Sequence, residues 1–265
     1  MVAHSSLITV MEKAARKAAP RLRRDFGEVD ALQVSRKGPA DFVSNADRAA
    51  EATVVEILRH ARPDWGLVLE EGGTIKGEDE RCRWIVDPLD GTSNFLHGIP
   101  HFAISIAAEV DGEVVSGLIH QPLTGESFWA EKGRGAWLSD RRLRVSSRRD
   151  LNDCLMATGI PYQGHGNRDQ FSAVLASVMP EVAGVRRFGA AALDLAWLAA
   201  GRFDGFWEAG LSHWDVAAGM LLVREAGGFV SDYRGGQDMV ARREIVAGNQ
   251  AIHSKLHKLV AGALR

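Results

Sequence analysis

The chain has 265 residues, of which 46% are hydrophobic and 25% charged, and its formal net charge is −2. This composition is typical of a folded protein with a large core, and the near-balanced charge argues against a nucleic-acid-binding protein. No run approaches the roughly 20 apolar residues of a membrane span, and the basic N-terminal segment lacks the apolar stretch of a signal peptide. We therefore expect a cytoplasmic protein without nucleic-acid or membrane partners. Two cysteines, Cys82 and Cys154, fit a reducing compartment and leave a single bridge open.

Residues 1–145 show the pattern of helices packed on an antiparallel sheet. Apolar residues recur every three or four positions from Leu7 to Phe26 and again from Ala46 to Leu58, which predicts two amphipathic helices. The segment 35–41 between them contains glycine and proline and is interpreted as a loop. Further strands are expected at 67–69, 102–108, 114–120 and 127–131, with an Asp111-Gly112 hairpin turn between the second and third.

The composition changes near residues 146–150, and we place a domain boundary there. The N-terminal unit is then 1–145 and the C-terminal unit 146–265. In the second unit strands alternate with helices, which favours a mixed α/β layer. The expected strands cover 155–158, 185–188, 203–208 and 228–231, and the expected helices cover 170–180, 190–200, 214–226 and 252–264.

One segment, 84–97, reads WIVDPLDGTSNFLH and carries the strongest chemical signal. An apolar run leads into Asp87 and Asp90, which are separated by Pro88 and Leu89 and followed by a glycine. Two carboxylates at the end of a buried strand offer the oxygen ligands that hard divalent cations prefer, and the following turn offers backbone N–H groups for phosphate. A buried strand has no structural need to end in two carboxylates, so we favour a functional site.

Other acidic residues also stand at element ends. Asp47 lies in the first turn of a predicted helix, Glu70 and Glu71 end a short strand, and Asp215 begins an apolar helix. Taken alone, Asp47 is best explained as a helix cap and the two glutamates as a solvated loop. For Asp215 the cap and the functional interpretation are balanced, because a charge among apolar residues needs compensation.

The segment 84–97 resembles the first signature of the inositol monophosphatase family, and the segment 214–228 resembles its second. Weaker matches lie at 37–41 with Asp47, at Glu70-Glu71 and at 189–194. The resemblance covers essentially the whole chain. It implies an α+β fold built as a layered α/β/α/β/α sandwich, and a homodimeric Mg²⁺-dependent phosphate monoester hydrolase.

The resemblance also implies a metal-ligand set with two to three Mg²⁺ ions. One ion would be held by Glu70, Asp87 and the backbone carbonyl of Leu89. A second would be held by Asp87, Asp90 and Asp215, and a third, weaker ion would share Glu70 through waters. Asp87 would bridge two cations, which is physically reasonable because neighbouring cations need an anion between them.

Catalytic and substrate-binding roles carry over in the same way. Asp47, Glu70 and Thr92 would be catalytic, with Thr92 and Asp47 orienting and deprotonating a metal-activated water that attacks phosphorus directly. The sequence departs from the family pattern at Ser212, where animal members have histidine, and at Gly72, where the commoner ending is Glu-Glu-Ser. His213 lies one residue out of register and is not assigned the role of that histidine. The implied substrate contacts are Asp90, Gly91, Thr92, Ala191 and Glu208.

Several alternatives stay open at this point. The leading hypothesis is hydrolysis of myo-inositol 1-phosphate or a related sugar or polyol phosphate, with inhibition by Li⁺ expected from the resemblance. Fructose 1,6-bisphosphate, a 3′-phosphoadenosine nucleotide or histidinol phosphate are alternative substrates, and a non-catalytic regulatory module is an alternative function. Aromatic side chains at Phe203, Phe206 and Trp207 either contribute to a dimer interface or belong to the core.

Overall fold

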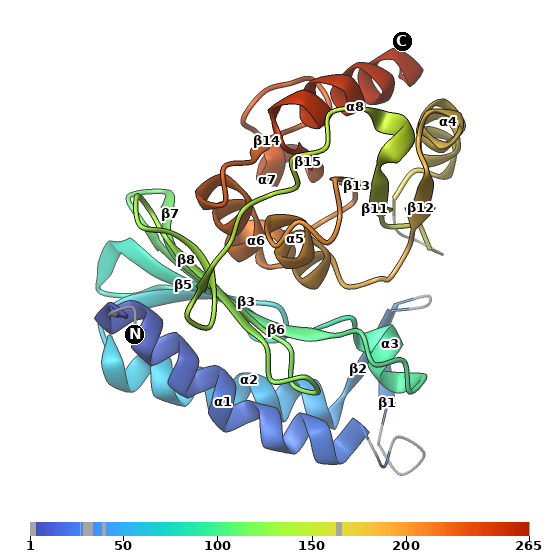
Figure 1. Cartoon of the computed structure of the whole chain (residues 1–265). Coiled ribbons are helices and arrows are strands. Elements are labelled where there is room, and N and C mark those ends of the chain that lie inside the picture. Colours follow the sequence, from blue (N-terminus) through green and yellow to red (C-terminus); the bar gives the residue numbers. More distant parts are fainter. Residues whose placement is uncertain (1–3, 27, 29–33, 39–40, 163–165, 265) are drawn as a thin grey trace.

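The computed structural model describes residues 4–26, 28, 34–38, 41–162 and 166–264, with backbone only for 34–38 and 41–44. Five layers alternate along the molecule in Figure 1: a helical pair, a large sheet, a second helical pair, a smaller sheet and an outer helical pair. The predicted α/β/α/β/α sandwich is therefore confirmed. None of the described helices is long and apolar enough to span a bilayer.

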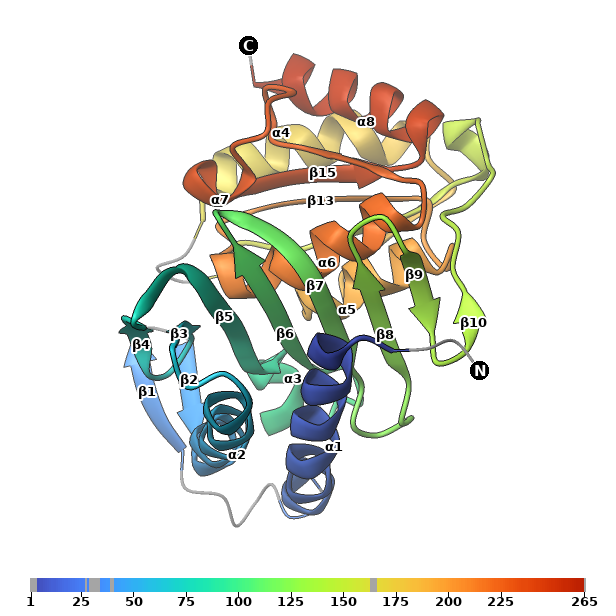
Figure 2. The same ribbon diagram turned by 90° about the vertical axis from the view of Figure 1, so that its left-hand side faces the viewer.

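The first helical layer consists of α1 (Ser6–Phe26) and α2 (Asn45–Ala61), which lie side by side on one face of the large sheet (Figure 2). Their apolar stripes, including Met11, Leu22, Val54 and Leu58, are fully buried against it. The eight strands run in the order β10-β9-β8-β7-β6-β5-β3-β4. They are β3 (Trp65–Leu69), β4 (Gly73–Ile75), β5 (Asp79–Asp90), β6 (Ala103–Val110), β7 (Glu113–His120), β8 (Ser127–Glu131), β9 (Gly135–Leu138) and β10 (Arg141–Arg142).

Two short strands pair between the first two helices, so the loop interpretation was wrong for 35–38 and 41, while residues 39–40 lie outside the described residues. Strands β1 (Val34–Gly38) and β2 (Asp41–Ser44) pair antiparallel, with an irregularity between Arg36 and Gly38. Glycine and proline signalled the reversal of the chain correctly. Strands of four or five residues on either side of a turn carry too little hydrophobic periodicity to be recognised.

Strand β5 delivers the two aspartates of the sequence signature to the end of the sheet. Its pairing with β6 shifts between Asp87 and Asp90, so that Asp87 lies opposite Ser105 and Asp90 opposite Ala103. Pro88 lies inside this bulge, where the missing N–H costs no regular ladder bond. The bulge turns both carboxylates out of the sheet toward one place.

The second half of the chain supplies the middle helices, the smaller sheet and the outer helices. Helices α5 (Ala191–Ala199) and α6 (His213–Glu225) pack between the sheets, and the sheet order is β12-β11-β13-β15-β14. Helices α4 (Arg168–Val178) and α8 (Gln250–Ala263) cover its outer face (Figure 2). The remaining elements are α3 (Thr92–Leu96), α7 (Met239–Arg242), two short 3₁₀ turns (Leu151–Asp153 and Met179–Glu181), β11 (Leu155–Thr158), β12 (Gly184–Arg186), β13 (Gly205–Ala209), β14 (Phe229–Ser231) and β15 (Glu244–Gly248).

One hydrophobic core connects the two halves of the chain. Ile85 and Ile119 of the large sheet belong to the same buried cluster as Leu193 of α5 and Phe206 of β13. The division at residue 146 stays a prediction about chain organisation. The interface interpretation of Phe203, Phe206 and Trp207 was wrong, because all three are at most 2% exposed within a single chain. Cys82 and Cys154 are both buried free thiols, so the bridge left open by the sequence is not formed.

Buried His120 at the end of β7 predicts acid sensitivity. Its Nδ1 lies 2.8 Å from Ser127 Oγ, and burial, with smaller contributions from Arg16 and Arg23, lowers its pKa to about 4. The unfolded chain binds the proton first, so the stability contributed by neutral His120 is complete above pH 6.5 and is lost as pH falls toward 4. We expect the contribution of His120 to the free energy of unfolding to fall by roughly 2 kcal/mol between pH 7 and pH 5.

Urea unfolding of the wild type and of His120→Asn at several pH values measures this contribution. The difference between the two free energies of unfolding should change by that amount between pH 7 and pH 5, with the wild type losing more. Two parallel curves would contradict the assignment.

Candidate active site

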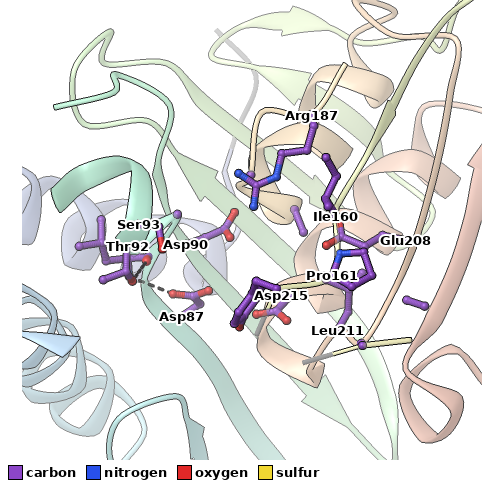
Figure 3. Close-up of a pocket in the computed structure, with 18 of the residues that line it drawn as sticks. Asp87, Asp90, Thr92, Ser93, Ile160, Pro161, Arg187, Glu208, Leu211 and Asp215 are labelled. Carbon is purple, nitrogen blue, oxygen red and sulfur yellow. Dashed lines mark hydrogen bonds between the residues drawn. The ribbon is translucent and has the colours of Figure 1, made fainter. Parts of the chain in front are cut away.

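A cavity of about 370 Å³ opens where the end of β5, the start of α6 and the end of β13 meet. Its lining includes all the acidic side chains that the resemblance placed on metal or substrate, together with Gly91, Thr92 and Ala191, whereas Asp47 is not part of the lining. Figure 3 shows Asp87, Asp90, Asp215 and Glu208 around this cavity. Residues from four distant parts of the chain thus meet at the end of β5. Without the resemblance, the sequence pattern had indicated a site there only for Asp87 and Asp90.

Backbone amides orient the two aspartates of β5. Asp87 accepts a hydrogen bond from the N–H of Leu89 (2.9 Å). Asp90 Oδ2 accepts from the N–H groups of Ala192 (2.8 Å) and Leu193 (3.4 Å) in the first turn of α5. These bonds cap the positive end of α5 with a carboxylate and hold Asp90 in one orientation.

Asp47 and Thr92 form the pair that the resemblance implied. Thr92 Oγ1 lies 3.0 Å from Asp47 Oδ1 and 3.0 Å from the carbonyl oxygen of Leu89. Asp47 is fully buried in the first turn of α2, while Thr92, at the start of α3, lines the cavity. The pair therefore joins a buried carboxylate to a hydroxyl that can contact a ligand.

The remaining two acidic positions lie at element ends. Glu70 directly follows β3, and its N–H donates to the carbonyl of Val86 in β5 (3.2 Å). Asp215 forms a capping box at the start of α6, where its Oδ2 accepts from the N–H of Ser212 (2.6 Å). The departure at Ser212 thus has a structural explanation, because serine is a favourable N-cap residue.

Gly91 allows the turn after β5 to pass close to neighbouring backbone. Its φ is 91°, and a Cβ at this position would lie 2.9 Å from the carbonyl oxygen of His101 and 3.1 Å from the Ala190 Cβ. Any side chain would strain the turn and push these neighbours away. The turn therefore presents unobstructed backbone to the cavity.

Burial, followed by mutual repulsion, raises the pKa values of the acidic group. Burial, followed by the charges of Glu70, Asp90 and Asp215, raises the pKa of Asp87 well above its usual range. Burial and the charge of Asp215 do the same to the pKa of Asp90, against the lowering effect of the α5 amides. Buried carboxylates in such an arrangement are neutralised either by protons or by a compensating cation.

The donor set fits hard divalent cations in chemistry and charge. Carboxylates and a backbone carbonyl are the ligands that Mg²⁺ and similar ions prefer. Among the residues that the structure describes, no three carboxylate, imidazole or thiol groups form a preorganised metal-binding site. Binding of such a cation would therefore require side-chain rotation that brings these oxygens together.

Glu208 lines the cavity near the end of β13. Burial, followed by the charges of Asp194, Asp215 and Asp90, raises the pKa of Glu208 well above its usual range. A Cβ at Gly159 would overlap the carboxyl group of Glu208, so the glycine makes room for it. Ala191 begins α5 and lines the same cavity.

Sequence reasoning missed three side chains around this cavity. Arg187 lies in the cavity lining, and Figure 3 shows it across the cavity from Thr92. Behind the cavity, buried His101 lies with its Nε2 3.0 Å from Asp194, and Asn94 donates to the carbonyls of His101 (2.7 Å) and Phe188 (2.6 Å). Asn94 and Asp194 stood inside the recognised motifs, but Phe188 lies 94 residues from Asn94 and His101 lies 93 residues from Asp194.

Comparisons with known proteins agree with this geometry. The model of the inositol monophosphatase family matches residues 3–265. An inositol-1-monophosphatase from Mesorhizobium japonicum is 56% identical, over 98% of this chain and 97% of its own. The Nus factor SuhB of Pseudomonas aeruginosa is 46% identical, over 92% of this chain and 91% of its own. A crystal structure of the extragenic suppressor protein suhB from Bartonella henselae superposes with a TM-score of 0.94 at 55% identity, covering 97% of this chain and 98% of that one.

The fold and the acidic cavity define a phosphatase of the sugar-phosphatase type. The chain belongs to the inositol monophosphatase family. Members of this family depend on metal ions, in agreement with the donor set of the cavity.

Proposed function

We propose that this protein hydrolyses myo-inositol 1-phosphate or a closely related polyol phosphate in the presence of Mg²⁺. The observation that carries the proposal is the meeting of Asp87, Asp90, Asp215 and Glu208 in one cavity beside the Asp47–Thr92 pair. The relatives named inositol-1-monophosphatase support the choice of substrate.

Two or three Mg²⁺ ions would be held by Glu70, Asp87, Asp90, Asp215 and the carbonyl of Leu89. Bound there, the metal ions neutralise the phosphate charge, lower the pKa of bound water and stabilise the leaving oxygen. The amides of Gly91 and Thr92, at the turn after β5, would donate hydrogen bonds to the phosphate, and Asp90 would lie beside it. We also expect Li⁺ to inhibit the enzyme, as in the family that it resembles.

The chain's own residues orient the attacking water. Thr92 donates its hydroxyl hydrogen toward the carboxylate of Asp47, which leaves the lone pairs of Thr92 Oγ1 to accept a hydrogen bond from water. This places the water beside the phosphate and draws its proton toward the Thr92–Asp47 pair. Glu70, which also lines the cavity, would be the further catalytic carboxylate.

The alcohol part of the substrate would lie between Ala191 and Glu208. A carboxylate accepts hydrogen bonds from two neighbouring hydroxyl groups, which suits a polyol. A second phosphate placed here would face the carboxylates of Glu208 and Asp215, which favours a polyol monophosphate over fructose 1,6-bisphosphate.

A substrate panel tests the proposal. Phosphate release is measured from inositol 1-phosphate, fructose 1,6-bisphosphate, adenosine 3′,5′-bisphosphate and histidinol phosphate, with Mg²⁺ and with EDTA. We expect the highest kcat/KM on inositol 1-phosphate and loss of turnover in EDTA. Mg²⁺-dependent hydrolysis that favours another of the four would replace the substrate, and no Mg²⁺-dependent turnover at all would refute the enzyme proposal.

A regulatory role is the second candidate, because relatives 43–46% identical to this chain are named Nus factor SuhB. The retained carboxylate and hydroxyl set favours catalysis, since a scaffold without catalytic function gains nothing from buried repelling charges. A variant without phosphatase activity that still complements a deletion strain would assign the phenotype to the regulatory role.

A further inference from the structure

Arg243 has an unusual backbone conformation beside the active-site cavity. It lies between α7 and β15 with φ of 58°, a left-handed conformation that is unfavourable for residues with a side chain. Two other non-glycine residues of the described chain share this feature, and both lie in tight turns: Asp111 between β6 and β7, and Ser139 between β9 and β10. A strained conformation near a functional site is a reason to look for a role.

The side chain and the carbonyl of Arg243 both bind one three-residue segment, 210–212. Its Nε donates to the carbonyl of Leu211 (2.9 Å), and its Nη2 donates to the carbonyl of Gly210 (2.6 Å) and contacts Ser212 Oγ (3.3 Å). In return, the carbonyl of Arg243 accepts from the N–H groups of Gly210 (2.7 Å) and Leu211 (3.3 Å). The side chain of Arg243 thus binds the carbonyl oxygens of the segment, and its main-chain carbonyl binds the N–H groups.

That segment connects the two halves of the proposed site. It begins directly after β13, which carries Glu208, and ends at Ser212, the N-cap of α6, whose N–H binds Asp215. Gly210 and Leu211 themselves line the cavity. Any displacement of the segment therefore moves the polyol-side carboxylate relative to the metal-side carboxylate.

We infer that Arg243 is a positioning residue, which fixes Glu208 and Asp215 relative to each other through the segment 210–212. The kinetic consequences of this role rest on the proposed function, whereas the ordering of the segment 210–212 by Arg243 does not depend on it. The guanidinium group works through carbonyl oxygens and is not placed on the substrate. Its loss should weaken binding of the polyol and of Mg²⁺ more than it slows the reaction of the fully bound enzyme.

Glycine is the informative replacement. Arg243→Gly removes the guanidinium and relieves the left-handed strain, while the backbone carbonyl can keep its two bonds. Arg243→Lys keeps a positive charge with less hydrogen-bonding capacity. Ser139→Gly, at another left-handed position remote from the cavity, is the matched control for relief of strain.

Two readouts need no turnover: hydrogen exchange of a peptide covering 209–215 in the metal-free protein, and calorimetric titration with Mg²⁺. For Arg243→Gly we expect exchange at least about tenfold faster and Mg²⁺ affinity about tenfold weaker. We expect KM for inositol 1-phosphate to rise about tenfold with kcat within about threefold of wild type. Arg243→Lys should recover part of each effect, and Ser139→Gly should match wild type.

Three results would overturn the inference: wild-type exchange and Mg²⁺ affinity in Arg243→Gly, an activity loss that simply follows a lowered unfolding temperature, or equal effects in Ser139→Gly. Failure of the proposed substrate is recognised separately. In that case the wild type does not hydrolyse inositol 1-phosphate, and the exchange and calorimetry of Arg243→Gly still decide the role of Arg243.

Discussion

Asp90→Asn should abolish turnover and at the same time stabilise the metal-free protein. Asparagine keeps an oxygen that can accept from the N–H of Ala192, so the cap of α5 survives. It removes one of the negative charges that a metal ion between Asp87, Asp90 and Asp215 would need. Replacement of a residue that only supports a metal ligand commonly lowers metal affinity or activity roughly 10- to 100-fold. Asp90 would itself be a ligand, so we expect kcat/KM to fall at least about 10³-fold.

The gain in stability follows from the direction of the pKa shift. The pKa of Asp90 is raised in the folded protein, so the native state binds a proton more tightly than the unfolded chain. Stability is then lost as pH rises from the unfolded pKa near 4 through the folded value, and the uncharged asparagine of the variant avoids that loss. At neutral pH and without Mg²⁺ we expect an unfolding temperature higher by about 3 °C, the increment typical of roughly 1 kcal/mol in a domain of this size.

Asp204→Asn is the matched control for a buried aspartate outside the site. Asp204 is 2% exposed and bound by Arg148 (3.0 Å) and by the N–H of Leu155 (2.8 Å). Its replacement should lower the unfolding temperature and leave kcat/KM of the folded protein unchanged. Near-wild-type turnover by Asp90→Asn would remove Asp90 from the metal site, and a lowered unfolding temperature would show that its charge is already compensated.

The position of the site was predictable because its strongest signal is local. A buried strand ending in Asp87 and Asp90 with a glycine turn is visible within 14 residues, and Asp47, Glu70 and Asp215 stand at predictable element ends. The helices were equally predictable, since α1 and α2 carry long apolar stripes.

The parts that could not be predicted depend on contacts between distant segments. Strand β15 lies between β13 and β14, but its short apolar run follows two arginines and carries no alternation. The bond from Ala192 to Asp90 spans 102 residues, and the contact between His101 and Asp194 spans 93. The role of Arg243 depends on a left-handed backbone that arginine does not signal. Such features follow from tertiary packing, which periodicity and motif spacing do not encode.

Thr92→Val should separate catalysis from binding within the same cavity. Valine has nearly the shape of threonine but no hydroxyl, so it removes the group that lies 3.0 Å from both Asp47 and the Leu89 carbonyl. The amide of residue 92 and the carboxylates that surround the cavity stay in place. Because only the orientation and deprotonation of water are lost, we expect kcat to fall about 10²- to 10³-fold with KM within about threefold.

The serine variant and a second threonine make the comparison specific. Thr92→Ser keeps the hydroxyl and should retain at least about a tenth of the wild-type kcat, although its side chain has more rotational freedom. Thr53→Val is the control, because Thr53 Oγ1 donates only within α2, to the Ala49 carbonyl (2.8 Å), and its loss should not affect kcat. If Thr92→Val instead raises KM and leaves kcat intact, then Thr92 binds the ground-state phosphate and the water must be oriented by another residue, for which Glu70 in the cavity lining is the candidate.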